Sequence, residues 1–208
     1  MKKLTVVAAT GNKNKLKEFK EILSVYGFDA DIKSASDLGI HDFPEETEEN
    51  FIGNALIKAR FIFENIDVTD NTVVIADDSG LCVDALGGAP GVYSARYAGE
   101  NASDDDRINK LLEELKDVAD MDRTARFICS IATVLPDGRE LCSDGFMHGI
   151  ISREKHGQNG FGYDPVMYIP EFKCCVAELS ADEKNKISHR GAALRKMADE
   201  LKKIFKDV

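Results

Sequence analysis

The fold class is indicated early in the chain, by the stretch Leu4-Thr5-Val6-Val7-Ala8-Ala9-Thr10-Gly11-Asn12. Its mostly apolar first part is typical of a buried strand, which the glycine-containing turn ends. Apolar residues then recur at steps of three and four, at Leu16, Phe19, Leu23 and Tyr26. This spacing predicts an amphipathic helix, so that a strand, a tight turn and a helix open the chain.

Patterns further along the chain continue this alternation of strands and helices. Helical spacing of apolar residues runs over residues 51–66, 108–115 and 194–204, and strand patterns cover residues 73–76, 125–135 and 140–151. The last two strands flank Pro136-Asp137-Gly138, a strong turn signal. No linker or repeat divides the chain, so we expect one domain over residues 1–208, with an α/β fold and a mixed sheet.

The composition limits the classes of partner. The chain has 208 residues and a formal net charge of -10. An acidic surface repels polyanions, so we expect no binding to nucleic acid, although a local group of Lys and Arg still allows a small phosphorylated substrate. The five cysteines lack C-x-x-C spacing, which favours reduced thiols and a cytoplasmic location. No apolar run approaches the ~20 residues of a membrane span, so we expect no membrane contact.

The turn after the first strand, Thr10-Gly11-Asn12-Lys13-Asn14-Lys15, is the first candidate for substrate binding. Backbone N–H groups and the positive end of the dipole meet at a helix N-terminus, where they suit phosphate oxygens. Lys15 lies in the first turn and can reach the same anion. The alternative is a plain strand-to-helix turn that Asn12 caps, and the pattern is not a Walker loop.

Two carboxylates, Asp77 and Asp78, directly follow the apolar strand predicted at residues 73–76. Polar groups at the edge of a core need a reason to be there, and paired hard oxygen ligands bind Mg²⁺. One of the two can also take a proton from water. The alternative is an Asp-rich turn that ends the strand.

Two other stretches have both a functional and a structural interpretation. Residues 86–97 form a glycine-rich run that suits close backbone approach, or simply a flexible connection. The acidic stretch Glu45–Glu49 is by default a solvated face. Glu45 and Glu46 would contribute to a site only if the fold brings them to Asp78.

The last two candidates lie in the C-terminal quarter of the chain. In Gly160-Phe161-Gly162-Tyr163-Asp164-Pro165 an aromatic between two glycines can present its face to a base, or can plug the core instead. Lys184-Asn185-Lys186-Ile187-Ser188-His189-Arg190-Gly191 is a dense basic group at a predicted helix start. Such a group would bind phosphate, and its alternative is a solvated helix start.

Together these segments resemble the non-canonical purine triphosphate pyrophosphatase family, also called the Ham1-like or inosine triphosphatase family, and within it the bacterial type. The matching motifs occur in the family order and cover residues from about 4 to 200. They are Thr10-Gly11-Asn12-x-x-Lys15, Phe51-Ile52-x-Asn54-Ala55-x-x-Lys58-Ala59-Arg60, Ala76-Asp77-Asp78-Ser79-Gly80-Leu81, and residues 86–97, 160–165 and 188–191.

The resemblance implies an elongated α/β structure with a mixed sheet, two lobes and a central active-site cleft, usually as a homodimer. It also implies Mg²⁺-dependent hydrolysis of dITP, ITP and XTP to the monophosphate and pyrophosphate. By the same resemblance Asp78 would be the general base and a metal ligand, with Glu45 or Glu46 as the other acid at the metal. The substrate-binding residues would be Thr10, Gly11, Asn12, Lys13, Asn14, Lys15, Lys58, Ser79, Phe161, Gly162, Tyr163, Asp164, Lys184, His189 and Arg190.

Two competing hypotheses remain at this point. One keeps the enzyme class but changes the substrate to a modified pyrimidine or another small nucleotide. The other is a nucleotide-binding regulatory module in which Asp77 and Asp78 are structural. The acidic pair followed by Ser79 argues against a pure binder, which has little use for metal-ligating acids beside phosphates.

Overall fold

The computed structural model describes residues 3–25, 27 and 30–205, so Tyr26 of the predicted first helix lies outside the described residues. The chain forms two compact units. Unit 1 comprises Met1–Asp78, Cys129–Gly145 and Arg190–Val208, and unit 2 comprises Ser79–Ile128 and Phe146–His189. Each unit is therefore assembled from segments that lie far apart in the sequence.

The strands form one mixed sheet in the order β2-β1-β3-β4-β5-β6-β7. Strand β1 pairs in parallel with β2 and with β3, whereas β6 pairs antiparallel with β5 and with β7. The strands are β1 (Leu4–Ala8), β2 (Ala30–Ser34), β3 (Thr72–Val83), β4 (Thr124–Val134), β5 (Glu140–Ile151), β6 (Met167–Ile169) and β7 (Cys174–Cys175). The predicted α/β class with a mixed sheet is confirmed, while the elongated shape and the central cleft stay predictions.

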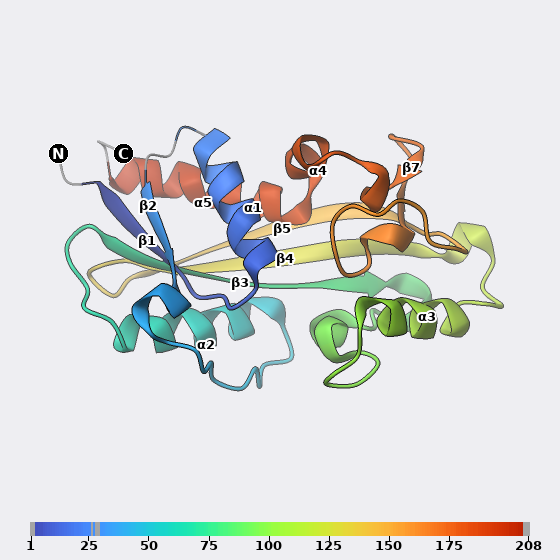
Figure 1. The fold of residues 1–208 in the computed structure, drawn as a ribbon, viewed down its shortest axis with the longest axis horizontal. Coiled ribbons are helices and arrows are strands. Elements are labelled where there is room, and N and C mark those ends of the chain that lie inside the picture. Colours follow the sequence, from blue (N-terminus) through green and yellow to red (C-terminus); the bar gives the residue numbers. More distant parts are fainter. Residues whose placement is uncertain (1–2, 26, 28–29, 206–208) are drawn as a thin grey trace. The chain divides into compact units, whose positions relative to one another are not determined.

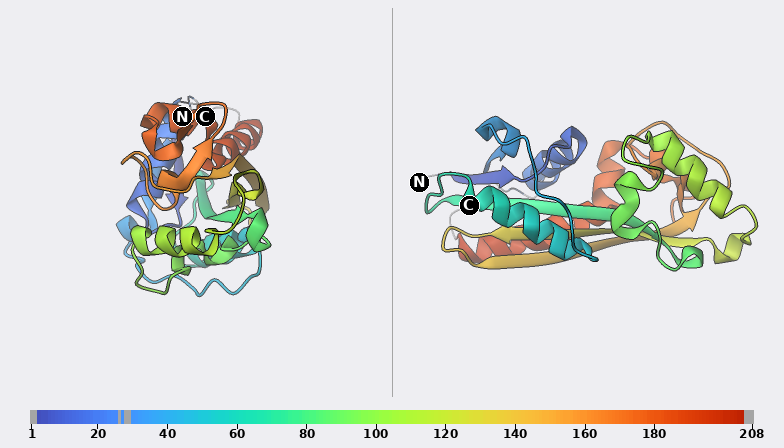
Figure 2. Two further views of the ribbon diagram at one scale, coloured as in Figure 1. Left: turned by 90° about the vertical axis from the view of Figure 1, so that its right-hand side faces the viewer. Right: turned by 90° about the horizontal axis from the view of Figure 1, so that it is seen from below.

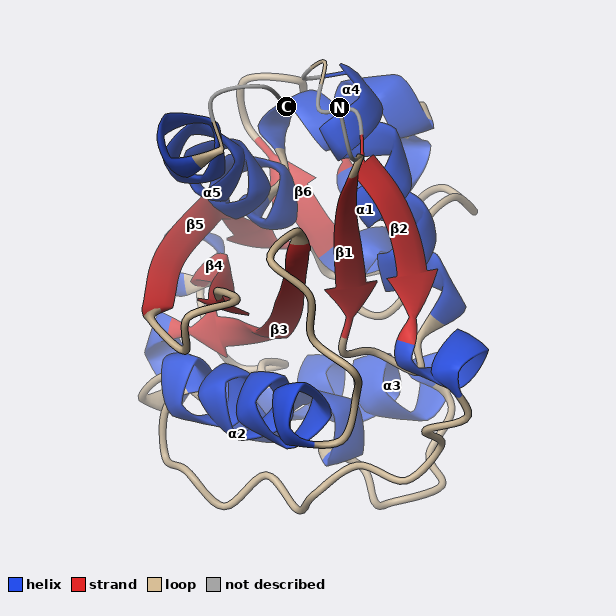
Figure 3. Ribbon diagram, turned by 90° about the vertical axis from the view of Figure 1, so that its left-hand side faces the viewer, coloured by secondary structure: helices blue, strands red, loops and turns tan. Residues whose placement is uncertain are grey.

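In unit 1, helices cover both faces of the parallel strands (Figure 1, Figure 3). Helices α1 (Lys13–Val25) and α5 (His189–Ile204) cover one face, and α2 (Phe51–Glu64) covers the other. Val6 and Val73 belong to the core under α1 and α5, whereas Val7 and Val74 belong to the core under α2. Because both faces are buried, the central strands β1 and β3 carry continuous apolar runs, Val6–Ala8 and Val73–Ala76, rather than alternating.

Strand β3 differs from its prediction. The sequence predicts a short strand at residues 73–76 with Asp77 and Asp78 just beyond its end, but β3 continues through both acids to Val83. The apolar residues Leu81 and Val83 extend the buried pattern, and both Asp side chains have cationic partners that allow them to be buried within a strand. The chain passes from unit 1 to unit 2 directly after Asp78.

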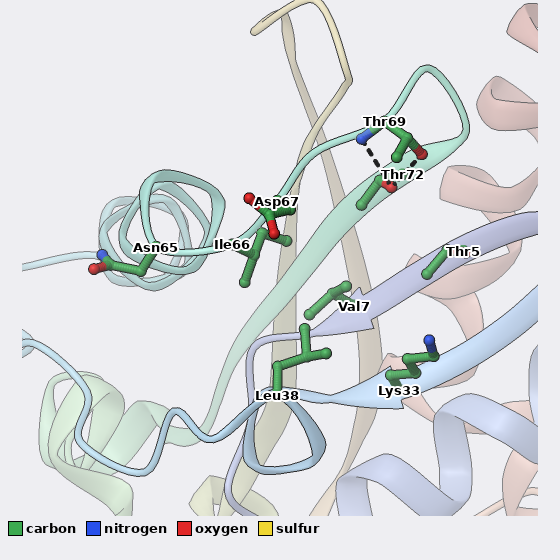
Figure 4. Close-up of a pocket in the computed structure, with 9 residues that line it drawn as sticks. All are labelled: Thr5, Val7, Lys33, Leu38, Asn65, Ile66, Asp67, Thr69 and Thr72. Carbon is green, nitrogen blue, oxygen red and sulfur yellow. Dashed lines mark hydrogen bonds between the residues drawn. The ribbon is translucent and has the colours of Figure 1, made fainter.

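Unit 1 also contains a hollow of about 400 Å³, away from the predicted substrate-binding residues (Figure 4). Thr5 and Val7 of β1 and Lys33 of β2 form one side, and the segment of residues 65–72 forms the other. The Thr69 and Thr72 hydroxyls lie 2.9 Å apart at its edge. None of the residues predicted to bind substrate or metal lines this hollow.

Unit 2 is built around one apolar cluster under α3 (Asp104–Glu114), which lies alongside its strands (Figure 2). Ser103 caps α3, and Ser180 caps α4 (Ala181–Ile187) with Glu183 as its capping-box partner, the spacing that the sequence Ser180-Ala181-Asp182-Glu183 predicts. Short 3₁₀ turns complete the connections, at Ala35–Leu38 in unit 1 and at Asp84–Leu86, Gly91–Arg96, Asp120–Asp122, Asp164–Val166 and Val176–Glu178 in unit 2.

All five cysteines are free, in agreement with the absence of a disulfide pattern in the sequence. Cys82, Cys129 and Cys175 are buried, and Cys142 is exposed. Among the described residues, no helix is long and apolar enough to cross a membrane.

Arg123 joins three chain segments inside unit 2. Its side chain is 2% exposed and donates to the carbonyl oxygens of Leu115, Ile151 and Ser152 at 2.5–3.0 Å. Leu115 is the C-cap of α3, so the guanidinium satisfies a helix-end carbonyl and complements the helix dipole. Burial lowers the pKa of Arg123, but an arginine remains charged at neutral pH.

We expect Arg123→Met to destabilise the protein by ~3 kcal/mol, because three buried carbonyl oxygens would lose a charged donor. Urea unfolding at neutral pH measures this. Arg139→Met is the matched control, since Arg139 is exposed and its side chain contacts Asp137, two residues away in the β4–β5 turn. Equal stability of the two variants would contradict this role for Arg123.

Candidate active site

The turn between β1 and α1 is capped by its own side chains. Asn12 Oδ1 accepts hydrogen bonds from the backbone N–H groups of Asn14 (2.9 Å) and Lys15 (3.3 Å). The Thr10 hydroxyl accepts from the Asn12 N–H at 3.1 Å. The structural interpretation of Asn12 as a cap is thus confirmed. Because two first-turn N–H groups are already used, the turn offers an anion fewer donors than an uncapped helix would.

Lys15, on the first turn of α1, reaches Asp77. Its Nζ lies 3.0 Å from Asp77 Oδ2, and the side chain of Lys15 is 17% exposed whereas that of Asp77 is fully buried. Arg190 Nε and NH2 contact the same Asp77 oxygen at 3.3 and 3.2 Å. Asp77 thus joins α1, β3 and α5 through charged contacts.

The pKa of Asp77 follows from these neighbours. Burial raises it, but the positive charges of Lys15, Arg190 and Lys58 outweigh burial and hold the pKa of Asp77 well below its usual range. Burial lowers the pKa of Arg190, but the negative charges of Asp77 and Glu18 outweigh burial and raise it. Asp77 is therefore ionised across the whole physiological range and cannot serve as a proton acceptor.

Asp78 has different partners, on α2. Asn54 Nδ2 donates to Asp78 Oδ2 at 3.3 Å, and Lys58 Nζ lies 3.7 Å from Asp78 Oδ1. Asn54 and Lys58 are four residues apart, so both project from the same side of α2. Burial raises the pKa of Asp78, with Lys58 acting in the opposite direction and Glu46 adding to the increase.

Lys58 is shared between Asp78 and Glu46. Its Nζ lies 2.7 Å from Glu46 Oε1, and Glu46 comes from the segment that precedes α2. Burial lowers the pKa of Lys58, but Asp78, Asp77 and Glu46 together raise it. Of the adjacent acids Glu45 and Glu46, Glu46 is the one that lies near Asp78, whereas Glu45 is exposed to solvent.

The neighbouring acids Asp77 and Asp78 point to opposite faces of β3, as successive residues of a strand must. Asp77 meets α1 and α5, and Asp78 meets α2. Among the residues that the structure describes, no three His, Cys, Asp or Glu side chains converge as a ready-made metal cage. Asp78 and Glu46 are nevertheless two hard carboxylates beside one cation, and this donor set fits Mg²⁺, which often binds one or two carboxylates together with substrate phosphates.

A second group of predicted residues lies in unit 2, around Asp164. Its carboxylate is 4% exposed, accepts from the Phe161 N–H at 3.0 Å and contacts Lys184 Nζ at 2.8 Å. Lys184 also lies 4.5 Å from the centre of the Phe161 ring, on its face. At Gly160, with φ +77°, an added Cβ would lie 2.1 Å from Asp164 Oδ2. The loop therefore requires glycine where the carboxylate folds back on it.

Tyr163 is part of the unit 2 core and does not present its ring to solvent. The residue is 4% exposed, and its hydroxyl donates to the Ser94 carbonyl at 3.0 Å. The Ser94 hydroxyl accepts from Leu81 N–H and donates to the Gly91 carbonyl. Of the two aromatic residues in this segment, Tyr163 is therefore buried in the core, whereas Phe161, the one between the two glycines, is only half-buried. The glycine-rich run gains a structural purpose, since it anchors Tyr163.

The basic segment 184–191 is not a solvated helix start. Lys184, His189 and Arg190 are all buried, and only Lys186 of its charged residues is exposed. His189 stacks on Phe127 in unit 2 with ring centres 4.9 Å apart. Lys184 meets Asp164 in unit 2, and Arg190 meets Asp77 in unit 1. The predicted single basic cluster is therefore divided among separate acidic partners.

Two residues of the unit 1 group were missing from the predicted site: Glu18, which contacts Arg190, and Asn54, which holds Asp78. Asp77, a candidate metal ligand in the sequence, instead contacts Lys15 and Arg190. Glu18 lies three residues after Lys15, and Asn54 lies four residues before Lys58. Helical spacing therefore places Glu18 on the same helix face as Lys15 and Asn54 on the same face as Lys58, a signal that could have indicated both residues. Among the predicted residues, Gly11, Lys13 and Asn14 are exposed, and Ser79 lies half-buried in unit 2.

A buried carboxylate pair with opposite pKa shifts is typical of an enzyme active site. A model of the Ham1 family matches residues 6–200. The protein named dITP/XTP pyrophosphatase of Bacillus anthracis is 47% identical over 207 residues, covering 96% of this chain and 97% of its own. That of Bacillus subtilis is 46% identical over 192 residues, covering 92% and 94%.

Solved structures agree with this match. A HAM1 protein from Coxiella burnetii superposes with a TM-score of 0.84 at 42% identity, covering 96% of this chain and 99% of its own. The Staphylococcus aureus Ham1 protein gives 0.83 at 40% identity, covering 95% and 98%. The chain belongs to the Ham1 family. The predicted family and the predicted enzyme class, a nucleoside-triphosphate pyrophosphatase, are both confirmed.

The opposite pKa shifts predict opposite effects of two neighbouring substitutions on stability. Asp77→Asn should cost ~3 kcal/mol at neutral pH, because Lys15 and Arg190 would lose the carboxylate that they share. Asp78→Asn should leave stability unchanged or raise it by ~1 kcal/mol, because it removes a charge that burial disfavours. Urea unfolding with a chelator present measures both.

The pH dependence of stability further distinguishes Asp77→Asn from Asp78→Asn. The folded-state pKa of Asp77 lies below its unfolded value, so its stabilisation is complete above the ordinary carboxyl range and is lost as the pH falls through the depressed value. The folded-state pKa of Asp78 is raised, so ionised Asp78 destabilises the folded protein. This destabilisation develops as the pH rises and is absent in acid. Equal pH profiles for both variants would contradict the assignment.

Proposed function

We propose that this chain hydrolyses dITP, XTP and ITP to the nucleoside monophosphate and pyrophosphate. The observation that carries the proposal is Asp78, a buried carboxylate of raised pKa beside Lys58 and Glu46. The relatives named dITP/XTP pyrophosphatase support the choice of substrate. The raised pKa also meets a chemical requirement, since an ordinary carboxylate with a pKa near ~4 is a weak base for water.

In the proposed reaction a water oxygen attacks the α-phosphorus in line with the bond to the β-phosphate oxygen. Asp78 orients this water and accepts its proton, while the P–O bond to the leaving pyrophosphate breaks. Lys15 and Lys58 neutralise negative charge on the triphosphate as it shifts to the leaving group. Asn54 keeps Asp78 oriented through its 3.3 Å hydrogen bond.

We propose that Mg²⁺ is required and that Asp78 and Glu46 hold it together with substrate phosphates. When bound, the cation supplies charge neutralisation and lowers the pKa of coordinated water. Lys58 lies between the same two carboxylates and offsets part of their repulsion when substrate is absent. Its position keeps both acids beside one positive charge, as the two ligands of a cation site need to be.

We propose that Phe161 and its neighbours recognise the base. Phe161 offers a half-buried ring for stacking, and Lys184 and the Asp164 carboxylate fix the position of that ring. Inosine and xanthosine carry an acceptor oxygen at the purine 6-position, where adenosine carries an amino donor. A donor such as His189 or a backbone N–H therefore favours the oxo bases, and an unmatched donor pair costs ~1–3 kcal/mol.

We further propose a cytoplasmic homodimer that binds neither nucleic acid nor membrane. The net charge of -10 disfavours nucleic acid, and five free cysteines suit a reducing compartment. The dimer rests on the family resemblance alone.

The experiment that tests this function measures pyrophosphate release from dITP, XTP, ATP and GTP at slightly alkaline pH, with and without Mg²⁺. We expect Mg²⁺-dependent release from dITP and XTP at least ~100-fold faster than from ATP, whose 6-amino group the donor disfavours. GTP carries the same 6-oxo group, so its slower release would require a second contact near its 2-amino group. Asp78→Asn is the catalytic control, and should lose turnover while nucleotide affinity stays within ~10-fold. Tight binding without release by the wild-type protein would favour a regulatory binding module. Equal release from all four would reject the proposed selectivity.

The two adjacent glutamates provide a matched test of the metal site. Glu46→Gln should raise the Mg²⁺ concentration needed for half-maximal activity by ~10-fold, because Glu46 is the acid that approaches Lys58 and Asp78. Glu45→Gln makes the same chemical change at an exposed position and should behave like the wild type. A larger effect at Glu45 than at Glu46 would overturn this assignment.

A further inference from the structure

We propose that Glu18 is a positioning residue for the reaction, acting on Lys15 through Arg190 and Asp77. The inference rests on the proposed function, in which Lys15 holds the triphosphate. Glu18 lies on α1, three residues after Lys15, and is 8% exposed among the apolar residues of that helix. It is thus a buried acid on the same helix face as a proposed substrate-binding residue.

The four side chains form a relay of alternating charge within unit 1. Glu18 accepts a hydrogen bond from Arg190 NH1, whose guanidinium is 2% exposed. Arg190 Nε and NH2 contact Asp77 Oδ2, and Lys15 Nζ contacts that same oxygen at 3.0 Å. Two cations and two anions balance in this relay, and Lys15, with a side chain 17% exposed, is its most accessible member.

The shared oxygen explains how Glu18 can act at a distance. Lys15 and Arg190 compete for Asp77 Oδ2, and Glu18 offers Arg190 a second carboxylate. Without the charge on Glu18, Arg190 would draw Asp77 toward itself, since a buried guanidinium needs compensation. The contact that orients Lys15 would then weaken. Glu18 thereby sets how firmly Lys15 is held.

Stability alone does not account for a buried glutamate at this place. A buried ion pair contributes no more to folding on average than well-packed apolar residues of the same volume. Phe19, Ile22 and Leu23 already give this face of α1 an apolar core contact. A charge retained here is better explained by the position that it imposes on Arg190 and, through Asp77, on Lys15.

The test is a double-mutant cycle on full-length protein, with pyrophosphate release from dITP as the activity. Glu18→Gln keeps the size of the side chain and one acceptor oxygen, and removes its charge. We expect it to lower kcat/KM by ~10-fold in the wild-type background, and by less than ~2-fold in a Lys15→Met background. A purely structural role would lower kcat/KM by the same factor in both, since it does not act through Lys15. kcat and KM are determined separately in each variant.

Glu21→Gln is the matched control, because Glu21 lies on the same helix and pairs with Lys17 at 3.7 Å, outside the relay. It should leave kcat/KM within ~2-fold of the parent in both backgrounds. Thermal unfolding checks that each variant is folded. Should Glu18→Gln not fold, Glu18→Met, which also removes the charge and keeps the length of the side chain, enters the same cycle with the same criterion.

The outcomes distinguish the inference from the function on which it rests. No pyrophosphate release by the wild-type protein would overturn the proposed function and the inference with it. An active wild type with equal losses in both backgrounds, or with no loss at all, would overturn the role of Glu18 alone. A loss confined to the background that contains Lys15 supports the relay.

Discussion

The burial of one carboxylate, Asp77, is the constraint on which unit 1 depends. Its side chain lies in the middle of β3 with no exposure, where an uncompensated charge would be prohibitively unfavourable. Lys15 from α1 and Arg190 from α5 supply the compensation. Because these cations come from different helices, ionised Asp77 holds both helices against one face of the sheet, and the apolar contacts around them follow the same arrangement.

The neighbouring Asp78 shows how one strand can prepare two acids for different tasks. Strand geometry turns consecutive side chains to opposite faces, so Asp77 meets two cations and Asp78 meets α2, with Asn54, one lysine and a second acid nearby. The pKa of Asp77 is lowered and that of Asp78 is raised. One carboxylate therefore stays a fixed charge that organises the protein, while the other is suited to accept a proton.

Much of the local structure was predictable from residue patterns. Apolar spacing located α1, α2, α3 and α5, the Pro136–Gly138 turn located the β4–β5 connection, and Ser180 with Glu183 marked the start of α4. The end of β3 was predicted wrongly, because acids inside an apolar run look like a turn until their cationic partners are known. The motifs predicted Lys58 and Asp78 as site residues, gave Asn54 no role although it stands in one of them, and did not include Glu18.

By itself, the sequence determined the fold class, the family and the types of residue available for catalysis, because periodicity, turn signals and motifs are local properties of the chain. The tertiary structure decided which of those residues meet. It brought Arg190 to Asp77 across 113 positions of sequence, selected Glu46 over Glu45 for contact with Lys58, and buried Tyr163 while leaving Phe161 half-exposed. The physical reason is that a pKa, an ion pair and a buried contact depend on neighbours in space, and those neighbours come from segments that only folding brings together.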